Sequence, residues 1–230
     1  METQPKKAKK PKVTVLICTL NEEKNLPSIL PKIPAWVDEI LMVDGHSTDN
    51  TIAVAKQIRP EIRVLHQPDK GKGNALRYGI QEASGEIVVT LDADGSTDPT
   101  ERDKFVAPLL EGYDFVKGSR FLGVRPVMPR LRCFGNWIFA TLTNILYGTK
   151  YTDVCAGLNA FWRRILPQID PDGKSFLDEP TLITRLKKKR LKVKEVPQRD
   201  VGRIMGKANE DFLRQGWRIL RIIITERFRG

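Results

Sequence analysis

An α/β domain with a mostly parallel sheet and helices on both faces is what the sequence predicts. Two observations predict it: short apolar, β-branched runs alternate four times with helix-like segments before residue 111, and polar residues follow the runs. Helices that connect parallel strands cover both faces of the sheet. A chain of 230 residues can bury one such core. We therefore expect a single α/β domain.

Local residue patterns predict each strand and the helix that follows it. The first run, residues 13–18 (VTVLIC), ends in a polar turn, and the second ends at Asp44. Residues 47–49 (STD) are typical capping residues for the helix that follows. Ligands of such sheets bind beyond the carboxyl ends of the strands, so the polar residues there are the candidate site. The expected strands are residues 13–18, 39–43, 62–66 and 87–91, and the expected helices are residues 22–30, 48–58, 73–83 and 99–110.

The net charge of +11 (39 basic minus 28 acidic residues) lies at the two ends of the chain. Residues 1–12 carry +4, residues 185–230 carry +10, and the segment between them carries −3. A slightly acidic body with basic ends differs from the basic face of a nucleic-acid binder, so we expect no nucleic-acid partner. Residues 1–12 are predicted to be a disordered basic tail, with attraction to anionic lipid as the alternative.

Cysteine and histidine are too scarce for a disulfide framework or a cluster of soft metal ligands. The three cysteines have no paired spacing, and the chain holds two histidines. No apolar signal core follows Met1, and no run reaches the roughly 18 apolar residues of a membrane span. We therefore expect a cytoplasmic protein in a reducing compartment.

The run that ends in Asp92-Ala93-Asp94-Gly95 carries the most specific chemistry. Two carboxylates separated by one small residue, with a glycine to turn the chain, offer hard oxygen ligands for Mg²⁺ or Mn²⁺. Such a site uses few protein ligands and leaves positions for substrate phosphates. The alternative is an Asx-turn loop without a ligand.

Several segments recur in a recognisable order. They are residues 16–23 (LICTLNEE), 42–51 (MVDGHSTDNT), 70–75 (KGKGNA) and 91–94 (LDAD). Together they resemble the inverting nucleotide-sugar glycosyltransferases of family 2, which have the Rossmann-like GT-A fold. Later segments resemble the polyprenyl-phosphate (dolichol-phosphate) branch: residues 116–120 (VKGSR), 153–161 (DVCAGLNAF), 176–180 (FLDEP) and 193–197 (VKEVP). The resemblance covers roughly residues 13–210, which we take as the glycosyltransferase domain, followed by a C-terminal helix over residues 211–230.

The resemblance implies a role for each matching residue. Asp44 would hydrogen-bond the base or ribose, and Arg120 would face phosphate oxygens. The implied metal ligands are Asp92 and Asp94. The implied donor-binding residues are Thr19, Asn21, Glu22, Asp44, Lys72, Asp92, Arg120 and Arg203. The implied catalytic residues are Asp94, Arg120, Asp153 and Glu179.

Three positions depart from the family pattern. Gly45 stands where a second aspartate is frequent, and Ser96 stands where close relatives often have a further metal contact. Residues 203–209 (RIMGKAN) match the basic, glycine-containing loop of the family only loosely. These departures concern the identity of the donor and the geometry of the metal, not the fold.

The expected reaction depends on the acceptor. In an inverting transfer, the acceptor displaces the nucleoside diphosphate in one step, with charge developing on the leaving group beside the metal. A lipid phosphate is already an anion at pH 7, whereas a hydroxyl acceptor needs a general base. Asp153, Asp178 and Glu179 are the candidate bases. Asp178 and Glu179 are equally suited to cap a helix that begins near Pro180, and Asp153 is equally suited to a structural hydrogen bond.

Two apolar segments raise the question of a membrane. Residues 128–147 contain Arg130, Arg132 and Gly135 and predict either a buried core helix or an interfacial helix near the acceptor. In residues 212–228, the apolar side chains form one stripe and Arg214, Arg218 and Arg221 lie on another face, advancing about 100° per residue. That pattern is typical of an interfacial helix, and a helix docked on its own domain looks similar. We expect peripheral attachment to an anionic membrane surface.

The sequence thus predicts a metal-dependent inverting transferase that moves a sugar from a nucleotide donor to a polyprenyl phosphate. A hydroxyl acceptor, soluble or lipid-linked, is the alternative enzyme. A non-catalytic nucleotide-sugar binder is the alternative without turnover. A nucleotidyltransferase would normally have a glycine-rich phosphate loop after the first strand, and residues 19–23 contain no glycine.

Overall fold

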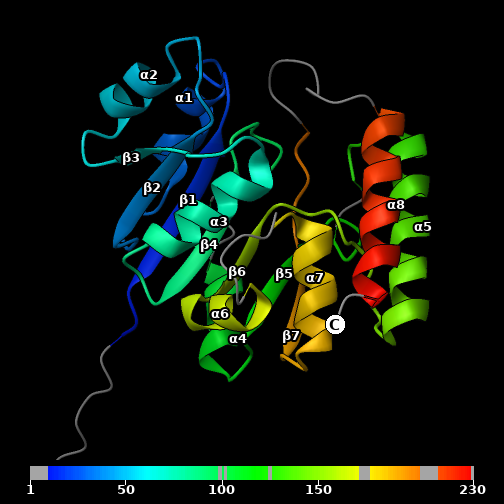
Figure 1. Cartoon of the computed structure of the whole chain (residues 1–230). Helices are drawn as coiled ribbons and strands as arrows, with labels where there is room; N and C mark the ends of the chain where they lie inside the picture. The colour runs from blue at the N-terminus through cyan, green and yellow to red at the C-terminus, as the bar shows by residue number, and fades with distance from the viewer. Residues whose placement is uncertain are drawn as a thin grey trace, which may run out of the picture.

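The computed structural model describes residues 10–97, 100, 103–123, 126–170, 177–202 and 212–228, and residues 1–9 of the expected basic tail lie outside them. A seven-stranded sheet runs through the domain (Figure 1) in the order β3-β2-β1-β4-β6-β5-β7. The strands are β1 (Val13–Thr19), β2 (Glu39–Asp44), β3 (Arg63–His66), β4 (Ile87–Asp92), β5 (Phe115–Ser119), β6 (Asn159–Trp162) and β7 (Val193–Pro197). The four predicted strands are therefore confirmed.

The strand directions explain where the site lies. β1 pairs in parallel with β2 and β4, and β2 pairs in parallel with β3. The carboxyl ends of these four strands thus meet at one edge of the sheet. β6 runs antiparallel to both β4 and β5, an insertion that the sequence pattern did not reveal. β5 and β7 are parallel to each other.

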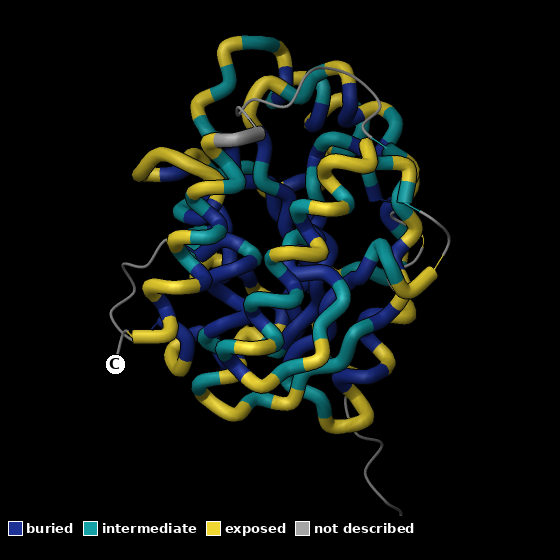
Figure 2. Tube along the Cα trace, turned by 90° about the vertical axis from the view of Figure 1, so that its right-hand side faces the viewer, coloured by how far each residue is buried: buried dark blue, intermediate teal, exposed yellow. Residues whose placement is uncertain are grey.

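Alternate residues of the strands face two separate apolar cores. Figure 2 shows that most of the buried chain lies in the interior of the domain. Val15 and Ile17 of β1 pack with one set of helices, α1 (Leu26–Ile29), α2 (Thr51–Ile58) and α4 (Asp103–Leu110). Leu16 points to the other face, which is covered by α3 (Lys72–Glu82), α5 (Arg130–Tyr147), α6 (Leu166–Ile169) and α7 (Glu179–Lys188). This period of two is why the central strands are apolar throughout.

Two helices begin later than the sequence pattern predicts. The helix expected over residues 22–30 is only α1, continued by a 3-10 turn at Leu30–Lys32, because the backbone of Asn21 is left-handed (φ 57°) and Pro27 and Pro31 each begin a new turn. The helix expected over residues 48–58 begins at Thr51, since the carboxylate of Asp49 accepts the N–H of Thr51 at 3.0 Å.

The C-terminal helix α8 (Phe212–Phe228) packs on the domain beside α5 and α7 (Figure 1). Ile219 and Ile223 are buried, and the Tyr147 hydroxyl of α5 donates to the carbonyl of Ile223 at 2.8 Å. Arg185 of α7 makes two hydrogen bonds of 3.0 Å to the carboxylate of Glu226. The inner face of α8 is therefore part of the core. Within the described residues, no helix combines the length and apolarity needed to span a membrane.

Candidate functional site

Asp92 and Asp94 lie where the central strand β4 leaves the sheet. Asp92 is its last residue, and the N–H of Ser96 donates to Asp94 Oδ1 at 3.0 Å across a turn in which Gly95 has a φ of 76°. This is the Asx-turn that the sequence offered as an alternative, and it fixes one carboxylate oxygen of Asp94. Asp92 lies against Gly157: a β-carbon at position 157 would lie 1.9 Å from its Oδ2, so a larger residue there would displace the Asp92 carboxylate.

Lys72, the first residue of α3, joins two carboxylates at this place. Its Nζ lies 2.7 Å from Asp92 Oδ1 and 2.5 Å from Glu179 Oε1. Burial by itself lowers the pKa of Lys72, but the two carboxylates outweigh it and raise that pKa well above its usual value. Burial raises the pKa of Glu179, and the nearby charge of Asp92 acts in the same direction while Lys72 opposes both. The three side chains form one electrostatic unit.

Asp44 lies at the end of β2, next to Thr19 at the end of β1. The sheet register pairs these two residues, and the Thr19 hydroxyl donates to Asp44 Oδ1 at 3.2 Å. The hydroxyl and N–H of Ser47 donate to the same carboxylate at 2.6 and 2.9 Å. His66 Nδ1 is 3.8 Å from Asp44 Oδ2. Asp44 is fully buried, so its carboxylate shapes the loop after β2.

Asn21 and Glu22 join the loop after β1 to the loop after β2. Asn21 Oδ1 accepts the N–H of Thr48 at 2.8 Å, and its own N–H donates to the hydroxyl of Ser47 at 2.9 Å. The N–H of Glu22 donates to the hydroxyl of Thr51 at 2.8 Å. The predicted nucleoside residues therefore lie together at the carboxyl ends of β1 and β2.

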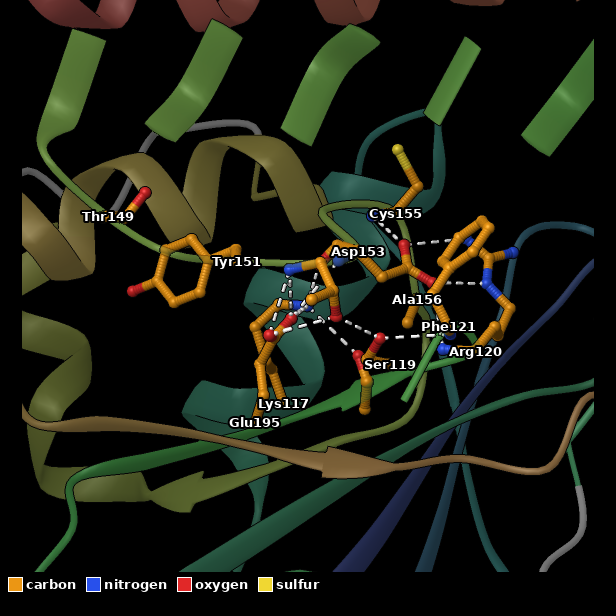
Figure 3. Close-up of polar contacts among 12 residues, drawn as sticks. Lys117, Ser119, Arg120, Phe121, Thr149, Tyr151, Asp153, Cys155, Ala156 and Glu195 are labelled. Atoms are coloured by element: carbon orange, nitrogen blue, oxygen red, sulfur yellow. Dashed lines mark hydrogen bonds and ion pairs between the residues drawn. The ribbon is translucent and has the colours of Figure 1, made fainter. Parts of the chain in front are cut away.

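Arg120 follows β5 and forms a two-point ion pair with Asp153 (Figure 3). Its Nε and Nη2 lie 2.6 and 2.9 Å from the two oxygens of the fully buried carboxylate. Burial alone raises the pKa of Asp153, but the Arg120 guanidinium outweighs it and holds that pKa below its usual value. The N–H of Cys155 also donates to Asp153, at 2.9 Å. Both oxygens of this carboxylate are thus engaged by donors.

The segment of residues 153–158 connects the two ion-pair groups. Asp153 at its start pairs with Arg120, while Gly157 near its end lies against Asp92. The Thr90 hydroxyl donates to the carbonyl of Gly157 at 2.7 Å and fixes this segment to β4. The motif of residues 153–161 therefore has a structural role, because it brings the Arg120–Asp153 ion pair and Asp92 to the same edge of the sheet.

Lys117 and Glu195 both hold the backbone of Asp153, and the sequence pattern revealed a role for neither residue. The almost fully buried ammonium group of Lys117 donates to the backbone carbonyl of Asp153 and lies 3.2 Å from Glu195 Oε1. Glu195 in turn accepts the N–H of Thr152 at 3.0 Å. A lysine inside a strand next to glycine was the available signal, since lysine is rarely buried without a partner.

A second contact that the sequence did not reveal holds the loop after Asp94. Gln198, which follows β7, donates its amide to the hydroxyl of Thr97 at 2.9 Å, and both side chains are buried. The N–H of Val201 donates to the carbonyl of Ser96 at 3.0 Å. The segment after β7 thus fixes the loop that carries Asp94. Arg203, predicted to bind the donor, lies just beyond this segment and outside the described residues.

Asp178 and Glu179, which the sequence left as either caps or functional acids, separate in the structure. Asp178 is the N-cap of α7 and accepts the N–H of Thr181 at 3.1 Å. Glu179 instead faces Lys72. One residue of the pair therefore stabilises the helix start, and the other belongs to the polar group around Asp92.

The oxygen donors at the end of β4 fit a hard divalent cation that shares its coordination with a ligand. In the part of the chain that the structure describes, no three His, Cys, Asp or Glu side chains are grouped so as to enclose a metal ion by themselves. Asp92 and Asp94 supply two carboxylates, and Mg²⁺ sites typically use one or two carboxylates together with substrate phosphates. Lys72 adds positive charge beside Asp92, and Arg120 adds positive charge after the carboxyl end of β5.

Comparison with known proteins identifies the family. Residues 14–169 match the family described as Glycosyl transferase family 2. The chain is 31% identical over 191 residues to glycosyltransferase AglJ of Haloferax volcanii, covering 80% of this chain and 61% of AglJ. It is 32% identical over 174 residues to a dolichyl-phosphate hexose transferase of the same organism, covering 74% of this chain and 75% of that protein.

A solved structure confirms the fold class. The chain aligns with glucosyl-3-phosphoglycerate synthase of Mycobacterium tuberculosis, crystallised with Mn²⁺, uridine diphosphate and phosphoglyceric acid, with a TM-score of 0.72. The alignment covers 94% of this chain and 78% of that one at 21% identity. The expected GT-A arrangement, a mostly parallel sheet flanked by helices, is thereby confirmed. With its family match over residues 14–169 and relatives above 30% identity, the chain belongs to glycosyltransferase family 2.

Proposed function

We propose that this protein is a metal-dependent inverting transferase that moves a sugar from a nucleotide-sugar donor to a polyprenyl phosphate at a membrane surface. The observation that carries the proposal is the meeting of Asp44, Asp92 and Asp94 at one sheet edge, with Lys72 and Arg120 beside them. In this proposal, the nucleoside lies near Asp44, and the diphosphate with its divalent cation lies at Asp92 and Asp94. The dolichyl-phosphate hexose transferase among the relatives supports the lipid phosphate as acceptor.

In this proposal the donor lies along the carboxyl ends of β1, β2 and β4. Asn21, Glu22 and Asp44 shape the loops against the nucleoside, and Thr19 fixes the Asp44 carboxylate. Asp92 and Asp94 would hold Mg²⁺ or Mn²⁺, which when bound would neutralise charge on the diphosphate. Mn²⁺ and uridine diphosphate are present together in the M. tuberculosis structure, which supports this donor class.

Lys72 and Arg120 contribute the remaining positive charge. The Lys72 side chain is 46% exposed and reaches the edge of the Asp92 carboxylate. Arg120 uses two of its nitrogens, Nε and Nη2, for Asp153, and this two-point pair fixes the plane of the guanidinium group. We assign both residues to the phosphates of donor and acceptor, together with Arg203.

The surroundings of the three candidate bases favour an acceptor that is already an anion. Asp153 is buried and bound by Arg120, Asp178 caps α7, and Glu179 is paired with Lys72. Asp153, with its depressed pKa and both oxygens engaged, is a poor proton acceptor, while Asp178 is used by the helix cap and Glu179 by Lys72. A polyprenyl phosphate requires positioning and no deprotonation, so this arrangement fits it better than a hydroxyl acceptor.

The outer faces of α5 and α8 supply the surface for a lipid acceptor. At 100° per residue, the exposed apolar residues of α5 lie opposite its buried face, and those of α8 lie next to the side that meets α5, so the two stripes adjoin. These residues, which we call the apolar outer surface, are Leu131, Phe134, Trp137, Ile138 and Ile145 of α5 and Trp217, Ile224 and Phe228 of α8. Exposed tryptophan and phenylalanine beside arginine are typical of interfacial helices.

The donor is tested by thermal unfolding in the presence of nucleotide sugars, with and without Mn²⁺. A true donor at about 100 times its Kd stabilises the native state by about 2.7 kcal/mol, which raises the Tm of a chain of this size by about 5 to 10 °C. Transfer is then measured with dolichyl phosphate in vesicles and with a water-soluble alcohol. Efficient transfer to the alcohol and none to the lipid would refute the proposed acceptor.

The apolar outer surface is tested with Trp137→Glu and Trp217→Glu, whose side chains are 60% and 71% exposed. Both variants should fold and bind the nucleotide normally but lose sedimentation with anionic vesicles. Leu110→Glu is the matched control, because Leu110 is 56% exposed on α4, which packs on the other face of the sheet. Equal vesicle binding by all three variants and the native protein would exclude this surface. Point changes are preferable to removing α8, whose inner face is part of the core.

A further inference from the structure

The ammonium group of Lys72 already occupies one oxygen of Asp92, the carboxylate that we assign to the metal. Nζ lies 2.7 Å from Asp92 Oδ1, a normal distance for a charged hydrogen bond. On the other side, the same carboxylate lies against Gly157 and fills the space that a β-carbon at position 157 would take, since that β-carbon would be 1.9 Å from Oδ2. Asp92 therefore lies between the ammonium group of Lys72 and the backbone of Gly157.

Glu179 keeps Lys72 in this position. Its Oε1 lies 2.5 Å from Nζ, and its side chain is only 14% exposed. The start of α7 that carries it is fixed by the Asp178 cap, and the N–H of Leu177 donates to the carbonyl of Gly73 in α3 at 3.3 Å. One ammonium group thus joins the first turns of α3 and α7 to the end of β4.

Asp92 and Glu179 place two carboxylates around the single ammonium group of Lys72. A divalent cation at Asp92 would be attracted by the carboxylates but repelled by the ammonium group of Lys72, which lies 2.7 Å from Asp92 Oδ1. A diphosphate changes this balance, because it offers the 46% exposed lysine another anionic partner.

We propose that Lys72 is a resident counter-ion of Asp92. When the divalent cation binds, Lys72 leaves Asp92 and pairs with the donor diphosphate instead. Cation and diphosphate then bind in a mutually dependent manner, because each removes an obstacle to the other. The protein without nucleotide then binds the cation weakly, and it binds the cation and the diphosphate together tightly. The inference rests on the proposed function in one respect: Asp92 is taken as a ligand of the cation.

Lys72→Met distinguishes this role from a structural one because it moves two affinities in opposite directions. Without nucleotide, Mn²⁺ should bind the variant on the order of tenfold more tightly than the native protein, since the positive charge 2.7 Å from Asp92 Oδ1 has been removed. Without metal, uridine diphosphate should bind on the order of tenfold more weakly, because a charged hydrogen bond is lost. Both affinities are measured by titration calorimetry, with no turnover needed.

Two further variants provide the controls. Lys72→Arg keeps a cation beside Asp92, so its Mn²⁺ affinity without nucleotide should stay as low as that of the native protein. Lys70→Met removes the same charge from an exposed residue two positions away and should leave the Mn²⁺ affinity within about twofold, because exposed charges are screened. Thermal unfolding confirms that each variant is folded.

The outcomes separate this inference from the proposed function. If Lys72→Met lowers or leaves unchanged the affinity for Mn²⁺, while Mn²⁺ still strengthens nucleotide binding to the native protein, the counter-ion role is wrong and the proposed function stands. A parallel loss of both affinities would mean a purely structural role and would also overturn it. If the native protein binds no Mn²⁺ even with nucleotide, both the inference and the metal-dependent function fail.

Discussion

Gly157 lies so close to Asp92 that a side chain at position 157 would clash with the Asp92 carboxylate. A β-carbon on Gly157 would approach Asp92 Oδ2 to 1.9 Å and Oδ1 to 2.7 Å. The two residues are 65 positions apart in the sequence and meet because β6 inserts next to β4. The backbone of residue 157 thus sets the orientation of the carboxylate that we assign to the metal.

Gly157→Ala should therefore impair the site without removing any charge. The methyl group displaces the Asp92 carboxylate, and misplacement of a reacting group by about 1 Å can reduce the rate on the order of a hundredfold. We expect kcat/KM to fall by this order and Mn²⁺-dependent nucleotide binding to weaken. Gly216→Ala is the matched control, since its β-carbon would meet Phe139 Cζ at an ordinary 3.7 Å. Unchanged kinetics in Gly157→Ala would show that the Asp92 orientation is unimportant.

Asp94→Asn should abolish transfer and leave the fold intact. The amide is isosteric with the carboxylate, and its oxygen can still accept the N–H of Ser96, so the turn persists. The negative charge that would bind the cation is lost. Sugar transfer is measured alongside the Tm, and Asp92→Asn should behave similarly. An active Asp94→Asn enzyme, or native turnover in excess chelator, would contradict the metal assignment.

Asp44→Ala should weaken the binding of nucleoside diphosphate by about 1.5 to 3 kcal/mol, the range for hydrogen bonds of a charged group. The structure adds an indirect contribution, because Asp44 holds the Ser47 hydroxyl and N–H. Ser47→Ala removes the hydroxyl contact alone and isolates this loop effect. Calorimetric titration of both variants separates the two. Equal losses in both would mean that Asp44 acts only through the loop.

Asp153→Asn should destabilise the protein by about 3 kcal/mol, since it leaves the Arg120 guanidinium partly buried without its counter-charge. In a domain of this size the Tm should fall by about 6 to 12 °C. Asp69→Asn, in an exposed pair with Arg77 whose aspartate is 58% exposed, should change the stability by less than about 1 kcal/mol.

The same ion pair predicts a dependence on pH. Burial alone raises the pKa of Asp153, and Arg120 lowers it by more, so the folded-state pKa lies below the unfolded value of about 3.9. The stabilisation is therefore fully present above that value and is lost as the pH falls through the folded-state pKa. The difference in unfolding free energy between the native protein and Asp153→Asn should stay constant from about pH 5 to 8 and shrink below about pH 4. Urea unfolding at several pH values measures it, and a difference that grows in acid would refute the ion-pair explanation.

The sequence by itself determined the four parallel strands, the order of the polar loops and the family resemblance. Apolar runs such as residues 13–18 and 87–91 are local patterns, and in a parallel sheet they bring their carboxyl ends together whatever the distant chain does. That is why local patterns alone were enough to place Asp44, Asp92 and Asp94 at one edge. Their roles as ligands stay predictions.

The tertiary structure decided which polar groups are paired with one another. Lys72 and Glu179 are 107 positions apart in the sequence, and Arg120 and Asp153 are 33 positions apart. β6 lies antiparallel between β4 and β5. No local pattern encodes such pairs, because they depend on the packing of helices and loops from separate parts of the chain. The same holds for α8, where one amphipathic stripe is divided between buried Ile223 and exposed Trp217. Periodicity gives the faces of a helix, and only packing decides which face meets the core and which meets solvent.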